Sequence, residues 1–292
     1  MKTKLLLSTV AIGLSVYNCD QIETENASIS TVEAIDAMTD YTQAARHFQG
    51  VNNACDYVVS YSENKEDNNT KSITGPDIIY SPSDLATFPL SITVDYGTNG
   101  TLGLDGRVRK GKIHIQLENT WFNQQGSKYI ATFENYFQND HQIEGIHTVN
   151  NLGKDSNGHL VFKVEVSNGQ VTNEQGQVLH FEQQTTRTCI TGDDTPLNIW
   201  DDSYLIEGVQ SGICSNGITY LLTIRDNNPL EVAPICPYIK SGIVDVYIDN
   251  SPDININYFV DENEDQIADC SSSSTVTIGN YEYKIGNAGT QN

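Results

Sequence analysis

One short acidic run carries the clearest metal-binding signal in the sequence. Between Val260 and Cys270, oxygen-bearing side chains recur at alternate positions: Asp261, Asn263, Asp265 and Asp269. Calcium loops use such spacing, because the ion takes about six to eight hard oxygen ligands on a tight turn. Gln266 stands where EF-hand-like loops have glycine, and Ser272 stands where they have a bidentate glutamate. The run therefore predicts either a weak Ca²⁺ site or a solvated acidic hairpin.

The chain has 6 cysteines, and none of them is spaced as Cys-x-x-Cys. Metal binding by thiolates is therefore not expected. An oxidising compartment would favour disulfides instead. Spacing alone does not fix the connectivity. We predict the pairs Cys236–Cys270 and Cys189–Cys214, because each would tie neighbouring parts of a sheet, and we expect Cys55 to be left over.

A basic cluster gathers four of the 16 lysines and arginines: Arg107, Arg109, Lys110 and Lys112. In so acidic a chain this cluster would suit an anion or an acidic partner. The alternative is pairing with the many carboxylates of the chain itself, where exposed ion pairs contribute only about 0–1 kcal/mol each.

No catalytic motif accompanies these residues. The histidines are scattered without a His-Glu-x-x-His pattern, and no Gly-x-Ser-x-Gly elbow or phosphate loop occurs. The pairs Asp193-Asp194 and Asp201-Asp202 offer two carboxylates for glycoside cleavage, but such pairs also form turns. We expect a protein that is not an enzyme and that holds no cofactor apart from the Ca²⁺ considered above.

The composition of the chain limits the classes of partner that it can bind. The 292 residues carry a net charge of −22, and 38% of them are hydrophobic. This hydrophobic content is enough for a folded core. The negative surface repels phosphate backbones and anionic lipid heads, so we expect no nucleic-acid partner.

The N-terminus has the features of a secretory signal over residues 1–19. Lys2 and Lys4 precede an apolar run from Leu5 to Val16, which is too short to span a bilayer. The run ends near Cys19 and resembles a bacterial lipoprotein signal, although Tyr17 and Asn18 depart from the usual lipobox. We predict lipidation of Cys19 and anchoring to the outer membrane. Ordinary cleavage, giving a free periplasmic or secreted protein, is the alternative.

The remainder of the chain is dominated by the alternation of apolar and polar residues. From Lys112 to Ile190 one apolar face recurs in strand after strand, and Asn157-Gly158 and Asn168-Gly169 provide hairpin turns. About a dozen strands at regular spacing predict an all-β fold. We expect a long antiparallel meander, as a curved sheet, sandwich or partial barrel, over residues 90–287.

One helix is expected before the sheet. After a polar tether over residues 20–29, Ser30 and Glu33 match a capping box, and Gly50 is the expected end of the helix. The apolar positions at steps of three and four are Val32, Ile35, Met38, Tyr41, Ala45 and Phe48. This stripe would pack on the dry face of the sheet, or would act as a removable lid over a ligand groove. Residues 30–89 thus form a region of helix and loops.

Four segments, at residues 107–113, 132–136, 143–145 and 229–242, stand out within the stretch from about Ile92 to Ile285. Together they resemble a family of bacterial outer-envelope lipoproteins that has no established activity. The resemblance implies an all-β lipoprotein on the outer membrane. The loop from Val260 to Cys270 is longer and more acidic here than in that family.

Two functional hypotheses follow, with a third less favoured. The first is a non-enzymatic envelope lipoprotein that acts as a structural or binding module for a protein, glycan or lipid partner. The second is a carrier of a lipid or other apolar ligand, held in a groove between the curved sheet and the helix. The third is an envelope hydrolase. An apolar groove would favour the carrier, a filled core the structural or binding module, and two converging carboxylates the hydrolase.

Overall fold

A single long helix and one large antiparallel sheet make up the protein. The structure is a computed structural model, and it describes residues 29–64, 75–195 and 198–286. The sheet has 15 strands, which follow one another in chain order except that β3 lies beside β4 and β11 lies beside β9. The predicted all-β meander with one N-terminal helix is therefore confirmed, and of the architectures considered the sheet is an open, curved one.

The elements have the following bounds. The helix is α1 (Thr31–Glu63), and a short 3₁₀ turn, η1, covers Ile199–Asp201. The strands are β1 (Asp77–Ser81), β2 (Leu90–Asp95), β3 (Thr101–Leu102), β4 (Val108–Leu117), β5 (Lys128–Gln138), β6 (His141–Lys154), β7 (Leu160–Thr172), β8 (Val178–Thr191), β9 (Ser203–Ile213), β10 (Thr219–Ile224), β11 (Leu230–Val232), β12 (Ile243–Tyr247), β13 (Ile254–Asn257), β14 (Ser273–Ile278) and β15 (Tyr281–Gly286).

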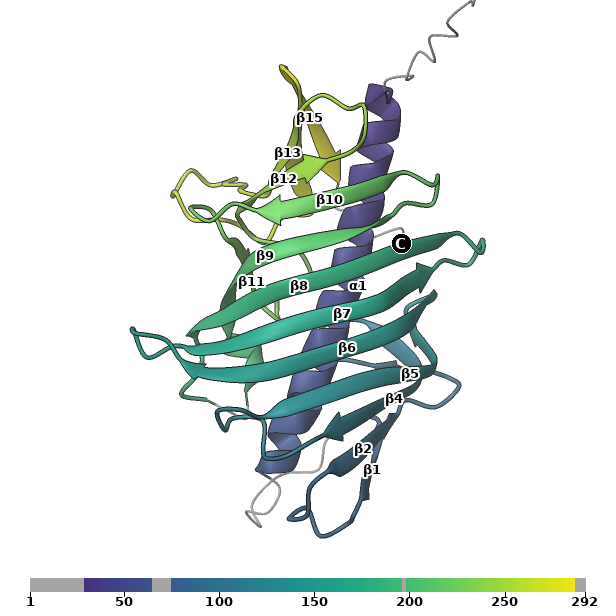
Figure 1. Cartoon of the computed structure of the whole chain (residues 1–292), viewed down its shortest axis with the longest axis vertical. Helices are drawn as coiled ribbons and strands as arrows, with labels where there is room; N and C mark the ends of the chain where they lie inside the picture. Colours follow the sequence, from purple (N-terminus) through teal and green to yellow (C-terminus); the bar gives the residue numbers. More distant parts are fainter. Residues whose placement is uncertain (1–28, 65–74, 196–197, 287–292) are drawn as a thin grey trace, which may run out of the picture.

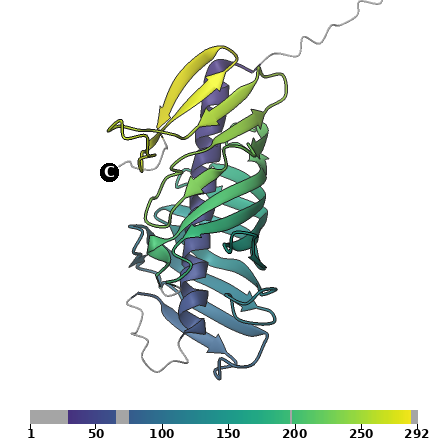
Figure 2. The same ribbon diagram turned by 90° about the vertical axis from the view of Figure 1, so that its left-hand side faces the viewer.

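The sheet curves around the helix, which runs across the strands along one face of the sheet (Figures 1 and 2). The alternation of apolar and polar residues along each strand explains this arrangement. In β4, for example, Ile113, Ile115 and Leu117 are buried against the helix side, while the residues between them face outward. Each such side chain contributes about 1.5–3 kcal/mol on burial. The helix covers the apolar face that the meander would otherwise expose.

The start of α1 follows the expected capping box. The Ser30 hydroxyl oxygen accepts a hydrogen bond from the backbone amide of Glu33, and the Glu33 carboxylate accepts one from the backbone amide of Ser30. The predicted stripe is only partly buried. Met38, Tyr41 and Phe48 are fully enclosed, whereas Val32 in the first turn is 67% exposed. The buried residues of the helix pack on the sheet, as the simpler hypothesis for the stripe predicted.

The predicted end of the helix at Gly50 is wrong, because α1 continues to Glu63. Gly50 packs directly against side chains of Gln138 on β5 and of Arg107 just before β4. A Cβ atom there would lie 2.4 Å from Oε1 of Gln138 and 2.8 Å from Nη1 of Arg107. The glycine is therefore required by packing against another element, and a sequence pattern cannot distinguish this role from that of a C-terminal cap.

The predicted hairpin turn at Asn168-Gly169 is also wrong. Both residues lie inside β7, at a register shift between Val166 and Gly169 that marks a β-bulge. Asn168 has a φ of 53°, a conformation that asparagine tolerates in bulges as well as in turns. By contrast, Asn157-Gly158 does form the turn between β6 and β7.

The sheet begins earlier than the expected boundary at residue 90. β1 lies within the region expected to hold only helix and loops, and it pairs along its whole length with β2. The sheet therefore includes part of the 30–89 segment. No helix in the described ranges is long and apolar enough to cross a membrane.

Candidate functional site

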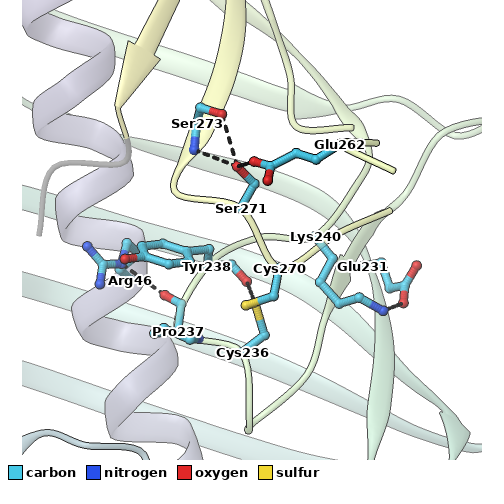
Figure 3. The surroundings of a disulfide bond; sticks show 10 residues. All are labelled: Arg46, Glu231, Cys236, Pro237, Tyr238, Lys240, Glu262, Cys270, Ser271 and Ser273. Atoms are coloured by element: carbon cyan, nitrogen blue, oxygen red, sulfur yellow. Dashed lines mark hydrogen bonds and ion pairs between the residues drawn. A yellow bond between two sulfur atoms is a disulfide. The ribbon is translucent and has the colours of Figure 1, made fainter. Parts of the chain in front are cut away.

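Cys19 and the 20–28 part of the tether lie outside the described residues. The first predicted disulfide, Cys236–Cys270, is present, with Cα atoms 5.8 Å apart. It joins the segment 233–241, named here the disulfide flap, to the acidic loop that precedes β14 (Figure 3).

The second predicted disulfide is not formed: Cys189, Cys214 and Cys55 are all buried free thiols. The register of β8 and β9 explains this. Cys189 lies opposite Tyr204 at one end of the strand pair, while His180 lies opposite Ile213, next to Cys214, at the other end. At about 3.3 Å per residue the two thiols are separated by about 30 Å, far beyond the reach of a disulfide.

The disulfide flap is fastened to the helix by one arginine. Nε of Arg46 donates a hydrogen bond of 2.9 Å to the carbonyl oxygen of Pro237, and its guanidinium lies 4.8 Å from the ring centroid of Tyr238 (Figure 3). On its other side the flap is connected to β11 by an ion pair of 2.5 Å between Lys240 and Glu231. The flap is thus held by the helix, by the sheet and by a covalent bond.

In the acidic loop before β14, carboxylate side chains accept hydrogen bonds from backbone amides of the same loop. The side-chain oxygens of Asp261 accept the amides of Asp265 and Gln266, and Asn263 and Asp265 cap amides two residues further on. Asp269 accepts the amide of Glu262. Within the described ranges no group of three or more histidine, cysteine, aspartate or glutamate side chains is arranged to hold a metal ion.

The basic cluster is divided between the two faces of the sheet. Arg107 and Arg109 point inward and are buried, and both bind the carboxylate of Asp105, at 2.9 Å and 2.6 Å. Lys110 and Lys112 are partly exposed and lie near Asp140 and Glu134, at 3.9 Å and 3.4 Å. The four residues therefore do not form one patch.

A polar cluster that the sequence did not predict lies in the interface between the C-terminal third of α1 and the sheet. Nη1 of Arg187 on β8 lies 2.6 Å from Oδ2 of Asp56 on α1. The hydroxyl of Tyr129 and the amide of Asn52 also donate to Asp56, at 2.9 Å and 3.1 Å. The Arg187 guanidinium lies over the ring of Tyr204, 4.4 Å from its centroid. Burial opposes its charge, but Asp56 raises the pKa of Arg187 above its ordinary value.

Next to this cluster lies a cavity of about 40 Å³. It is bounded by α1, the sheet and the disulfide flap, and the polar groups lining it include Asn52, His147 and Arg187. Oδ1 of Asn52, Nδ1 of His147 and Nη2 of Arg187 have no hydrogen-bond partner among the described residues. The volume is enough for roughly three water molecules at about 10–15 Å³ each, whereas a dry site for benzene needs about 150 Å³.

A pocket of about 220 Å³ at another edge of the helix contains Asp56, Asp193 and Asp202. Each carboxylate has a protein partner: Arg187 for Asp56, Lys154 for Asp193 and the Tyr204 hydroxyl for Asp202. Burial raises the pKa of Asp202 to about 6, although the hydrogen bond from Tyr204 opposes the shift. Asp201, the second member of the predicted pair, accepts hydrogen bonds from Thr195 and Asn198.

A surface cleft of about 430 Å³, named here the polar cleft, lies between α1 and the turns that precede β6 and β8. Its walls are Gln43, Arg46 and His47 of α1, Arg107 before β4, and the turn residues 139–141 and 173–175. Every one of these residues is polar or charged. The rings of His47 and His141, which both line it, lie with their centroids 4.6 Å apart and are tilted by 35° to each other.

The important side chains of these sites carried little signal in the sequence. Asp56, Arg187 and His47 belong to no recognisable motif and have other polar residues nearby in the sequence. The rule that buried charges are paired identifies them only once their partners are known. Of the four basic residues that the sequence analysis singled out, only Arg107 lines the polar cleft. Comparison of the chain with protein-family models, curated proteins and solved structures found no match.

Proposed function

We propose that the protein is a non-enzymatic lipoprotein of the cell envelope that acts as a binding module, anchored to the outer membrane through Cys19. The N-terminal signal sequence supports the anchor, and the Cys236–Cys270 disulfide is consistent with an oxidising compartment. The protein partners of the carboxylates in the Asp202 pocket favour binding over catalysis, because a general acid or base must be able to reach a substrate.

One observation favours the binding module over the lipid carrier. The interface between helix and sheet is filled by large side chains, such as Tyr41 hydrogen-bonded to Gln210 at 2.6 Å and Phe48 stacked on Phe181 at 5.1 Å. The cavity beneath the disulfide flap, about 40 Å³, is too small for an acyl chain, and the pocket of about 220 Å³ beside Asp56 is lined by three carboxylates, which disfavour an apolar ligand. Native mass spectrometry of the purified protein tests the distinction: we expect the mass of the chain without a co-purifying lipid. A stoichiometric lipid, retained after delipidation of the anchor-free variant Cys19→Ser, would support the carrier.

The anchor is tested separately. Cells fed a labelled fatty acid should incorporate the label into the wild-type protein and into a Cys214→Ala control, but not into Cys19→Ser. The wild-type protein should fractionate with outer membranes and Cys19→Ser with the soluble fraction. Soluble, unlabelled wild-type protein would contradict the proposed anchor and support ordinary cleavage of the signal.

A further inference from the structure

The cavity beneath the disulfide flap collects buried polar atoms that have no partner. Its walls come from α1, from strands β6 to β9 and β11, and from residues 236–239 of the disulfide flap (Figure 3). Asn52, His147 and Arg187 line it, and each is no more than 4% exposed. None of the three lines the neighbouring Asp202 pocket. Folded proteins leave few buried polar atoms unpaired, and those that remain are completed by water or by a ligand.

Arg187 supplies the unpaired donors of this cavity. Its Nη1 lies 2.6 Å from Oδ2 of Asp56. Its Nε and Nη2 have no hydrogen-bond partner in the described part of the chain. A guanidinium group donates hydrogen bonds and cannot accept them. The ligand atom that meets Arg187 must therefore be an acceptor.

Asn52 supplies one unpaired acceptor. Its side-chain nitrogen donates a hydrogen bond of 3.1 Å to Oδ2 of Asp56, and the carboxylate requires this orientation of the amide because it accepts only. The atom that remains is Oδ1, which has no partner among the described residues. Its ligand partner must be a donor.

His147 supplies a second unpaired acceptor. The Tyr129 hydroxyl donates its proton to Oδ1 of Asp56 at 2.9 Å, and the same hydroxyl oxygen lies 3.5 Å from Nε2 of His147. That oxygen can then only accept, so Nε2 carries the ring proton and Nδ1 is bare. Burial, with a further contribution from Arg187, lowers the pKa of His147 to about 3, so the ring has no second proton at neutral pH.

Two donors on one residue and two acceptors on two others select the chemistry of a ligand. A carboxylate only accepts, so it would leave both acceptors unpaired, and an ammonium group only donates, so it would face Arg187. Asp56 and Arg187 already neutralise each other, and an ion would bring a further charge into a buried site. A primary amide has a carbonyl oxygen with two lone pairs and an amino group with two N–H bonds, which match the set.

The remaining walls favour an organic ligand over water. Water can donate and accept as well, but Phe48, Val164 and Leu230 also border the cavity and offer it no hydrogen bond. The volume of about 40 Å³ equals that of roughly three water molecules, which suits a molecule of about three or four non-hydrogen atoms. A few polar groups among apolar walls are typical of small-molecule sites.

From these features we infer that the cavity beneath the disulfide flap binds a small primary amide. Its carbonyl oxygen would accept from Arg187, its amino group would donate to Asn52 and His147, and its alkyl end would lie against the apolar walls. Arg46 also borders the cavity, where it contacts Pro237 and Tyr238, and it is not a member of this binding set. The inference rests on the proposed function as a binding module, for which it names the ligand class.

Acetamide is a suitable probe, and acetate and acetone are its matched controls because they have the same shape without the N–H groups. In NMR spectra of the purified protein labelled with nitrogen-15, acetamide should shift the signals of Nδ1 of His147 and Nε of Arg187. The signals of His180 and Arg225, which do not line the cavity, should not move. We expect a millimolar dissociation constant, and binding of acetate and acetone at least about tenfold weaker.

A pair of variants on α1 tests the acceptor. Asn52→Leu keeps a similar volume but removes Oδ1, and it should weaken acetamide binding about tenfold. Thr42→Val removes a buried hydroxyl of the same helix that does not line the cavity, and it should bind acetamide like the wild type. Equal binding by Asn52→Leu and the wild type would contradict the assignment.

The titrations are carried out on the oxidised protein after overnight incubation and again after reduction, which removes the covalent tie of the flap, so slow entry cannot hide binding. No shift in either form up to about 100 mM acetamide would mean that the cavity holds water only and would overturn the inference. Acetate binding as tightly as acetamide would also overturn it, in favour of an anion site. The comparison of ligands uses the wild-type protein and does not depend on the folding of a variant. Failure here leaves the anchored, non-enzymatic module standing, because membrane fractionation and native mass spectrometry test that proposal independently.

Discussion

The carboxylate of Asp56 and the guanidinium of Arg187 form an ion pair of 2.6 Å that links the C-terminal third of α1 to β8, a central strand of the sheet. Side-chain exposure at the pair is only 4% and 2%, so both charges have left water and depend on each other. The pair lies between the cavity under the disulfide flap and the Asp202 pocket. It therefore fixes how the helix is seated on the sheet.

Removing one partner of this pair should be strongly destabilising. Arg187→Met leaves the Asp56 carboxylate buried without its cation, which costs about 3–5 kcal/mol in the free energy of unfolding. Urea denaturation followed by tryptophan fluorescence measures the loss. The double variant Asp56→Asn with Arg187→Met should recover a large part of it, because no uncompensated charge remains.

The exposed pair Arg225–Asp245, with contacts of 2.5 Å and 2.8 Å, is the matched control. Asp245→Asn should cost no more than about 1 kcal/mol, because water solvates the arginine left behind. A loss for Arg187→Met as small as the loss for Asp245→Asn would show that the buried pair does not seat the helix.

Gly50→Ala should destabilise the protein although alanine is the better helix former. Alanine gains about 1 kcal/mol in helix propensity over glycine. Its methyl group, however, would lie 2.4 Å from Oε1 of Gln138, and overpacking of this kind costs about 1–3 kcal/mol. We expect a net loss of stability in thermal unfolding. Gly286→Ala, where an added Cβ meets no atom within 4 Å, should be nearly neutral. A more stable Gly50→Ala protein would indicate that the helix can move away from the sheet.

Gly50 also illustrates which features of the fold the sequence could predict and which it could not. Alternation revealed the strands because each strand has one buried face, and that property is local to the strand. The length of α1 was underestimated because Gly50 owes its identity to Gln138 and Arg107, which are distant in the chain. Cys189–Cys214 was mispredicted for a similar reason, since only the register of β8 against β9 shows that the two thiols lie at opposite ends. The Asp56–Arg187 pair and the polar cleft likewise need the tertiary fold before their residues come together.

The protein should lose stability as the pH falls below neutral. Burial, with a further contribution from Arg187, lowers the pKa of His147 from an ordinary value of 6.5 to about 3. The unfolded chain then takes up a proton near pH 6.5 that the folded protein refuses until about pH 3. Between these values His147 alone removes about 1.4 kcal/mol per pH unit. His47 and His141, whose pKa values are also lowered by burial, add to the same trend.

Asp202 opposes this trend over part of the range. Its pKa is raised from 3.8 to about 6, so the folded protein gains a proton first, and stability rises as the pH falls between these values. Urea denaturation at pH 7, 5.5 and 4.5 separates the two effects. The slope should become shallower in His147→Gln and steeper in Asp202→Asn. An unchanged slope in His147→Gln would mean that the ring is not kept neutral by burial.

Loss of the Cys236–Cys270 bond should release the disulfide flap and destabilise the whole protein. The bond closes a loop with a sequence separation of 34, for which the chain-entropy model predicts a stabilisation of about 3–4 kcal/mol. The Cys236→Ser, Cys270→Ser double variant should therefore unfold at lower urea concentration than the oxidised protein, and its midpoint should not respond to dithiothreitol. The wild-type midpoint should fall toward that of the variant on reduction. Because reduction removes the covalent tie of the flap, hydrogen exchange of the 233–241 amides should also accelerate. Pro237 and Tyr238 of this segment contact Arg46 at the edge of the polar cleft. If the midpoint stays the same after complete reduction, the contacts of Arg46 and Lys240 alone are sufficient to hold the flap.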